Sequence, residues 1–107
     1  MSAKSLSVIS SGMTGIVIDV ECQLSKGLPS MTIVGIASKA VDESKERIRS
    51  AFINSNLAFP RKRITINLAP GDIPKDGTGI DLAIASAILF ASEQVHFDPA
   101  DSVFIGE

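Results

Sequence analysis

The chain has 107 residues, of which 45% are hydrophobic and 21% charged, and it carries one cysteine. This composition predicts one globular domain and excludes a disordered tail, because there is enough apolar surface to offset the entropy of ordering. An internal disulfide is excluded, which fits a reducing cytosol. With no long apolar run and no signal-peptide pattern, we expect a cytoplasmic protein with no membrane partner.

The charge balance limits the ways in which the chain can bind nucleic acid. Its net charge is −2, so such binding requires a local basic patch. The five phenylalanines are the only aromatic residues besides the single histidine, since Trp and Tyr are absent. Surfaces for stacking nucleobases are therefore expected to be few.

Three strands are predicted in the first third of the chain. A short strand is expected at residues 6–10, followed by a glycine-containing turn at 11–15. Residues 16–24 alternate between apolar and polar, which predicts a strand with one buried face. A third strand, rich in β-branched residues, is expected at 31–36. The two short connections favour an antiparallel start to the sheet.

A helix is predicted next, with Ser38 as its N-cap and its end near Asn54. A fourth strand is predicted around the alternating residues Ile64, Ile66 and Leu68. The element order before the last loop is therefore β-β-β-α-β.

A loop with two prolines and three glycines, residues 70–79, leads into a second helix at residues 80–92. This helix is apolar on nearly every side and is expected to be buried, with Thr78 or Asp81 as its cap. A turn is expected at residues 99–102, then a strand that has only begun at 102–107, which suggests truncation at the C-terminus. The order β-β-β-α-β-α-β predicts a two-layer α/β sandwich of the α+β class.

Five basic residues are candidates for nucleic-acid binding. Arg61, Lys62 and Arg63 are consecutive, and Lys26 and Lys75 lie in loops with glycine nearby. Arginine and lysine in such loops contact phosphates. The alternative is a solvated start of a strand, where cations also discourage unwanted edge pairing.

The glycine-rich loop at residues 71–79 is a candidate anion site, because glycines before a helix expose backbone N–H groups. A structural loop is the alternative, and the sequence has no P-loop of the form Gly-x-x-x-x-Gly-Lys-Ser/Thr.

No catalytic or metal-binding residue is predicted. His96 is the single histidine and is expected at the surface, because a metal site needs further ligands. Cys22 falls on the apolar face of a strand and is expected to be buried and inert. Asp72, Asp76 and Asp81 are explained by turns and capping, with a paired-carboxylate site as the alternative.

Four stretches together carry a resemblance to a known family. They are GLP at 27–29 with TIVG at 32–35; ERIRSA at 46–51; FP at 59–60 with RITINLAP at 63–70; and DIPKDG at 72–77 with DLAIA at 81–85. In this order and spacing they resemble the N-terminal domain of the Mg-chelatase-related AAA+ ATPases of the ComM/YifB type. The resemblance extends from about Ser5 to Glu107.

The resemblance implies a ribosomal-protein-S5-domain-2-like fold, shared with the Lon protease domain and the C-terminal domain of the RadA ATPase. It implies that the domain precedes an AAA+ module in a hexameric DNA branch-migration helicase of recombination and natural transformation. Self-association and DNA are then the expected partners, and ATP and Mg²⁺ the expected cofactors of the whole protein. The chain itself is expected to be non-catalytic and without a cofactor, and to serve ring assembly or DNA guidance.

Two other functions remain open. A Lon-like serine peptidase is suggested by residues 74–81, but the position that matches the Lon serine is Gly79. Thr78 lies one residue early, where a hydroxyl would miss its base, and Lys75 matches a loop lysine instead of the catalytic one. An RNA- or ribosome-binding module rests on analogy of fold alone.

Overall fold

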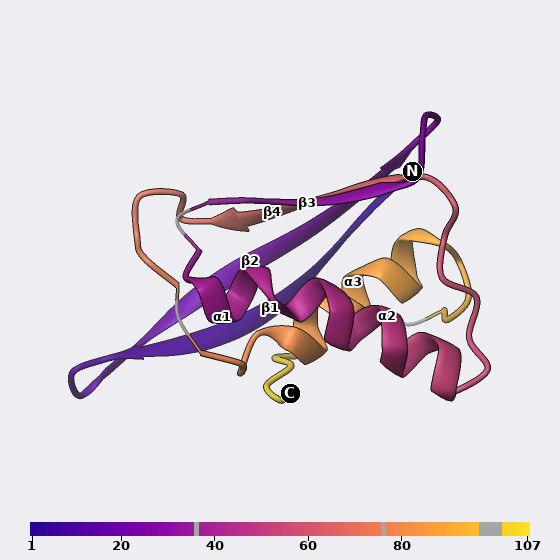
Figure 1. The fold of residues 1–107 in the computed structure, drawn as a ribbon. Helices are drawn as coiled ribbons and strands as arrows, with labels where there is room; N and C mark the ends of the chain where they lie inside the picture. Colours follow the sequence, from indigo (N-terminus) through magenta and orange to yellow (C-terminus); the bar gives the residue numbers. More distant parts are fainter. Residues whose placement is uncertain (36, 76, 97–101) are drawn as a thin grey trace.

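The structure, a computed structural model, describes residues 1–35, 37–75, 77–96 and 102–107. Among these residues, one sheet contains β1 (Ser2–Ser11), β2 (Thr14–Ser25), β3 (Ser30–Val34) and β4 (Arg63–Ala69). The strand order is β1-β2-β4-β3. β1 and β4 each run antiparallel to β2, whereas β3 runs parallel to β4 (Figure 1).

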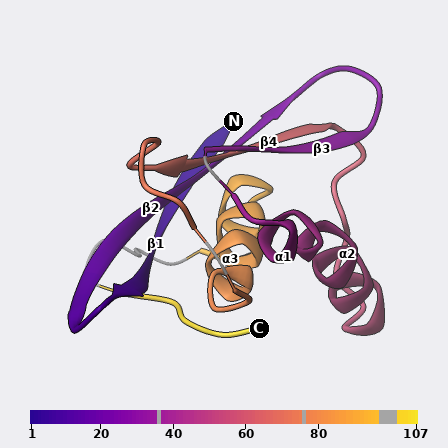
Figure 2. The ribbon, with the colours of Figure 1, turned by 60° about the vertical axis from the view of Figure 1, so that its left-hand side comes forward.

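The described helices are α1 (Lys39–Asp42), α2 (Ser44–Asn54) and α3 (Asp81–Ala91), and they lie on one side of the sheet (Figures 1 and 2). Figure 2 shows α3 beside β1 and β2, with α1 and α2 farther toward β3 and β4. This arrangement confirms a small mixed α/β domain with two layers. None of the described helices is both long and apolar enough to cross a membrane.

The core lies between the sheet and the helices, and the predicted alternation is confirmed. The inward side chains of β2 and β4 are buried, and so are the inward side chains of all three helices. The buried apolar residues are Ile18, Val20, Cys22, Leu24, Val41, Ile48, Phe52, Ile64, Ile66, Leu68, Ile80, Ala83, Ile84, Ala87, Ile88 and Ala91.

Small side chains allow α3 to approach β1 closely. Ser5 and Ser7 of β1 are buried, and the Ser5 Oγ donates a hydrogen bond to the Ala83 carbonyl at 2.6 Å. Ala83 and Ala87 on α3 are fully buried. β1 therefore turns a serine face toward the core, whereas β2 and β4 contribute branched apolar residues.

The predicted helix N-cap is confirmed, because the Ser38 Oγ accepts a hydrogen bond from the Val41 N–H at 3.4 Å. The helix that follows is assigned in two parts, α1 and α2, on either side of Glu43. That residue keeps helical angles (φ −68°, ψ −15°), so the two parts remain nearly continuous. α2 ends at Asn54, as predicted.

The prediction of an antiparallel hairpin between the second and third strands is wrong. β4 lies between them, with Arg63 opposite Ser25 of β2 on one side and Ser30 of β3 on the other. The helices between β3 and β4 carry the chain back to the end of the sheet at which β3 begins. β4 therefore starts beside the first residue of β3 and runs parallel to it.

Two smaller predictions are also wrong. Neither Thr78 nor Asp81 caps α3: the N-cap residue is Ile80, without a side-chain cap, and the Asp81 carboxylate binds Arg47 instead. Residues 102–107 form no assigned strand, although the Phe104 N–H donates to the Leu6 carbonyl of β1 at 2.8 Å. The end of the predicted third strand at residue 36 and most of the predicted turn at 99–102 lie outside the described residues.

Candidate functional site

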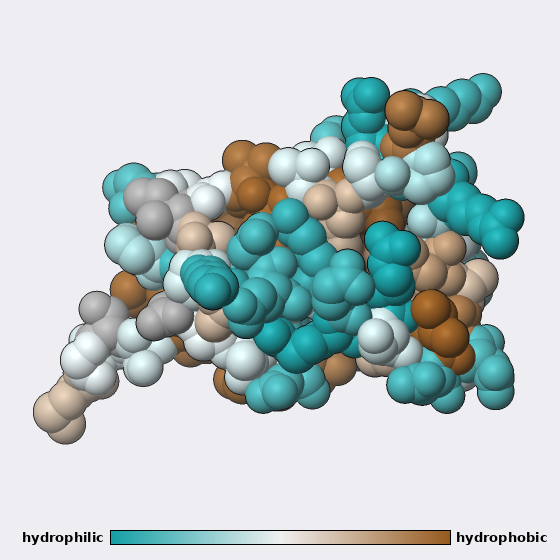
Figure 3. Space-filling model, in the orientation of Figure 1, coloured by the Kyte–Doolittle hydropathy of each residue, from teal (hydrophilic) through white to brown (hydrophobic). Residues whose placement is uncertain are grey.

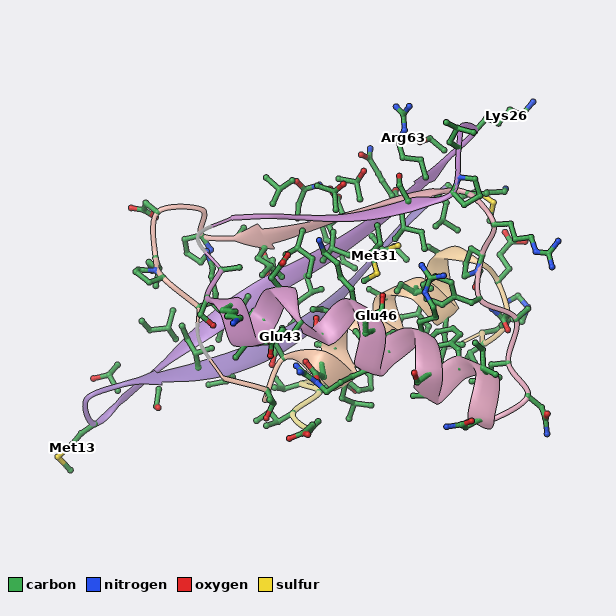
Figure 4. All side chains as sticks on the ribbon, viewed as in Figure 1. Met13, Lys26, Met31, Glu43, Glu46 and Arg63 are labelled. Atoms are coloured by element: carbon green, nitrogen blue, oxygen red, sulfur yellow. The ribbon has the colours of Figure 1, made fainter. Side chains whose placement is uncertain are left out.

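Four of the five predicted basic residues gather at one end of the sheet, which we call the basic end: Lys26, Arg61, Lys62 and Arg63. All four are exposed. The sheet register brings them together, because Arg63 begins β4 between the end of β2 and the start of β3. Figure 4 shows Lys26 and Arg63 at this end, with Arg63 directed away from the helices.

Gly27 allows the Arg63 side chain to lie against the loop that carries Lys26. A Cβ atom on Gly27 would lie 3.3 Å from the Arg63 Nη2 and 3.4 Å from its Nε. The glycine also has φ +152°, a backbone angle that residues with a side chain rarely adopt. The two cations therefore share the outer surface of the basic end.

A pocket of about 360 Å³ lies at the same end, toward the helices. Its described lining combines three cations with apolar surface and includes no acidic residue. The lining residues are Pro29, Ser30, Arg49, Ile53, Phe59, Pro60, Arg61 and Lys62. Figure 3 shows hydrophobic side chains among hydrophilic ones at this end of the molecule.

Arg49 joins the site from α2, and its position is fixed by two aromatic rings. Its Cζ lies 5.2 Å from the centre of the Phe59 ring, a cation–π contact. Phe59 packs edge-to-face on Phe52 at 5.4 Å between ring centres, and Phe52 is 2% exposed. The guanidinium is therefore anchored to the core through Phe59.

Sequence reasoning missed Arg49, which looked like one more polar residue on the solvated side of a helix. The one available signal is Ile53, one turn further along, which is apolar on that same side and 62% exposed. Phe59 lies in the connection between α2 and β4. Its contact with Arg49 forms because this connection folds back beside α2, which the local sequence pattern does not reveal.

The cations of the basic end take no part in the ion pairs within the described parts of the chain. The ion pairs found there involve Lys39, Lys45 and Arg47, and none of the five cations Lys26, Arg49, Arg61, Lys62 and Arg63. Several acidic side chains lie elsewhere, including Glu43 and Glu46 near the middle of the molecule (Figure 4). The end is thus locally positive on a chain with net charge −2.

Lys75 is placed apart from the other four candidates. It is 1% exposed, and its Nζ donates to the backbone carbonyl of Pro70, at the end of β4. A Cβ atom on Gly35 would lie 3.5 Å from that Nζ. The expectation that Lys75 shares a phosphate-binding surface with the others is therefore corrected, because its side chain folds back onto the strand ends.

The other candidates show little chemistry. A pocket of about 440 Å³ beside the glycine-rich loop has no cation among its described lining residues, so nothing there favours an anion. Cys22 is buried, as predicted, and burial raises the pKa of its thiol to about 12, which favours the protonated form. His96 is exposed, and the described residues contain no cluster of potential metal ligands. Asp76 lies outside the described residues.

The comparison with known families decides the identity of the domain. Residues 20–107 match the model of a family described as subunit ChlI of Mg-chelatase. The chain belongs to this ChlI family. The match includes the basic end, with Lys26, Arg49 and residues 61–63.

Individual relatives agree with the ChlI assignment and with the resemblance to ComM and YifB. The chain is 50% identical over 91 residues to the uncharacterized protein YifB of Escherichia coli, covering 84% of this chain and 18% of that protein. It is 46% identical over 86 residues to the competence protein ComM of Haemophilus influenzae, covering 80% and 17%. It is 30% identical over 102 residues to the uncharacterized protein Mb2921c of Mycobacterium bovis, covering 95% and 20%. The chain thus spans about a fifth of the length of these curated relatives.

Proposed function

We propose that this chain is a non-catalytic domain of a ComM-like AAA+ ATPase that moves branched DNA during recombination, and that its basic end guides the DNA. The observation that carries the proposal is the gathering of five cations without described ion pairs at one end of the sheet. The relative in Haemophilus influenzae is named a competence protein, a name that fits work on DNA. The proposal includes an S5-domain-2-like fold and a ring of several copies.

Phosphate contacts account for the physical role of the basic end. Each phosphate that a lysine or arginine neutralises releases bound counterions, so the affinity falls as salt rises. Contacts of this kind position DNA without reading its sequence, which suits a domain that must let DNA slide. ATP hydrolysis and Mg²⁺ are assigned to the remainder of the protein in this proposal.

The absence of catalysis is part of the same proposal. Gly79 occupies the position of the Lon serine and carries no side chain to act as a nucleophile. The Lys75 ammonium donates a hydrogen bond to the Pro70 carbonyl. We expect that the intact protein does not cleave casein and that Thr78→Ala changes none of its activities.

The test is ATP-driven branch migration of a synthetic four-way junction by the intact protein. The variant Arg61→Gln/Lys62→Gln is compared with Lys4→Gln/Lys39→Gln, which removes the same charge from exposed residues elsewhere. We expect the first variant to lower the rate at limiting DNA and to reduce the slope of log affinity against log salt by about 2. Hydrolysis of ATP without DNA should be unchanged in both variants.

Three results would count against guidance of DNA. If DNA binding is absent, or does not weaken as salt rises, the basic end does not contact phosphates. Equal activity of the two double variants would show that the location of the charge is irrelevant. Strong preference for RNA over DNA of the same sequence would favour the RNA-binding alternative.

A further inference from the structure

We propose that the pocket at the basic end holds one unpaired nucleotide of single-stranded DNA. The base would lie against Arg49 and Ile53, and the flanking phosphates on Arg61 and Lys62. This inference rests on the proposed function, because it names the form of DNA that this end holds.

The lining of the pocket matches the two halves of a nucleotide. Ile53 is 62% exposed, and Phe59 and the two prolines extend the apolar surface for the faces of a base. The cations supply the charge for phosphates, and the Ser30 hydroxyl lies in the same lining. The volume of about 360 Å³ is within the range of ordinary small-molecule sites.

Arg49 is prepared for stacking. A guanidinium is planar and stacks on aromatic rings and on nucleobases alike. Here it lies 5.2 Å from the centre of the Phe59 ring, and that ring is held by the buried Phe52. Because the side chain is already ordered, less conformational entropy is lost when a base arrives.

The form of DNA follows from the apolar part of the pocket lining. In a duplex the base faces are stacked on one another inside the helix, so they cannot lie against the apolar lining of a protein pocket. An unpaired strand can turn a base into the pocket while its backbone continues past the outer cations Lys26 and Arg63. Nucleic acid carries negative charge at regular intervals along its backbone, so one strand can contact both the cations of the pocket lining and the outer cations. This favours nucleic acid over an acidic peptide as the ligand.

The experiment measures binding of the intact protein to three labelled ligands by fluorescence anisotropy. They are a single-stranded oligonucleotide, its blunt duplex, and an abasic single strand of the same length, which keeps the phosphates and lacks the bases. The protein variants are Arg49→Gln, which removes the charge, and Arg49→Lys, which keeps the charge and removes the planar group. Lys39→Gln is the control, because its side chain is 91% exposed and lies on α1, outside the pocket lining.

We expect the normal single strand to bind about tenfold more tightly than the abasic strand, the magnitude of one stacked base. Both Arg49 variants should lose most of this difference while they bind the abasic strand within about threefold of one another. Lys39→Gln should retain the full difference.

The other outcomes separate the two proposals. Salt-dependent binding that is equal for all three ligands overturns the nucleotide pocket and leaves the guidance of DNA standing. No binding of any ligand overturns both. If the Arg49 variants bind DNA normally but change the mass of the assembly, the pocket is a contact between subunits, and the inference fails.

Discussion

Arg47 on α2 and Asp81 at the start of α3 form an ion pair with two hydrogen bonds. The Arg47 Nε lies 2.7 Å from the Asp81 Oδ2, and its Nη2 lies 3.1 Å from the Oδ1. The same Nη2 donates to the carbonyl of Ala40 at 2.9 Å. The hydrogen bond to Asp81 raises the pKa of Arg47. One side chain therefore joins all three helices.

We expect Asp81→Ala to lower the free energy of unfolding by about 2 kcal/mol, because the charge-assisted hydrogen bonds of a buried carboxylate are lost. Arg47→Gln should also destabilise, since it leaves that carboxylate buried without its cation. The double variant should lose less than the sum of the two, which urea unfolding can measure. As a control, Lys45→Gln breaks the more exposed pair with Asp42 and should change stability by less than about 1 kcal/mol. Additive losses would contradict a direct interaction.

Gly35 and Gly71 should respond differently to the same substitution. Gly35 has φ +122°, and a Cβ atom there would lie 2.8 Å from the Leu68 carbonyl oxygen, a backbone atom that cannot move aside. Gly71 has no heavy atom within 4 Å of such a Cβ. We expect Gly35→Ala to cost about 3 kcal/mol or more and Gly71→Ala less than about 1 kcal/mol. Equal melting temperatures for the two variants would contradict the close approach of β3 to β4 at Gly35.

Lys75 should matter for stability and not for DNA. We expect Lys75→Ala to lower the free energy of unfolding by about 2–4 kcal/mol, because a long buried side chain is lost and the Pro70 carbonyl loses its donor. Lys75→Met fills most of the same space, and its DNA affinity should stay within about twofold of the wild type. A large loss of DNA affinity in a folded Lys75→Met protein would show that Lys75 belongs to the DNA-binding surface.

Cys22 should make stability fall at high pH. Burial raises the pKa of this thiol from 9.0 to about 12, so the unfolded chain loses the proton first as pH rises. The contribution to stability is complete below pH 9 and disappears between pH 9 and 12. Unfolding measured at pH 8 and pH 10.5 should therefore show a smaller pH effect in Cys22→Val than in the wild type. Alkylation of Cys22 by iodoacetamide at pH 8 should likewise require unfolding.

The sequence predicted elements well where one strong pattern decides the structure. Residues 16–24 alternate clearly, and β2 buries the expected face. β1 carries a weaker pattern, because Ser5 and Ser7 are the residues that face the helices while Leu6 and Val8 face outward. Those serines are buried because α3 presents alanines opposite β1, a match between distant segments that local periodicity does not contain.

The basic end was predictable only where its residues are neighbours in sequence. Arg61, Lys62 and Arg63 are neighbours in sequence and stay together in space, whereas Lys26 joins them through strand pairing. Arg49 required knowledge of how α2 lies beside the return to β4. Lys75 was wrongly predicted to be exposed, because a lysine in a loop with glycines normally is. Its burial depends on the Pro70 carbonyl, which accepts a hydrogen bond from its Nζ.

The position of β4 has a consequence for how the protein is made. β4 is the last of the described strands in chain order, yet it pairs with both β2 and β3, and its final residue is Ala69. While the ribosome is still adding the residues before it, the β1–β2 hairpin and β3 have no strand to join them. Folding must therefore wait for well over half of this chain to emerge, and a nascent chain that stalls before Ala69 would present two unfinished strand edges to chaperones.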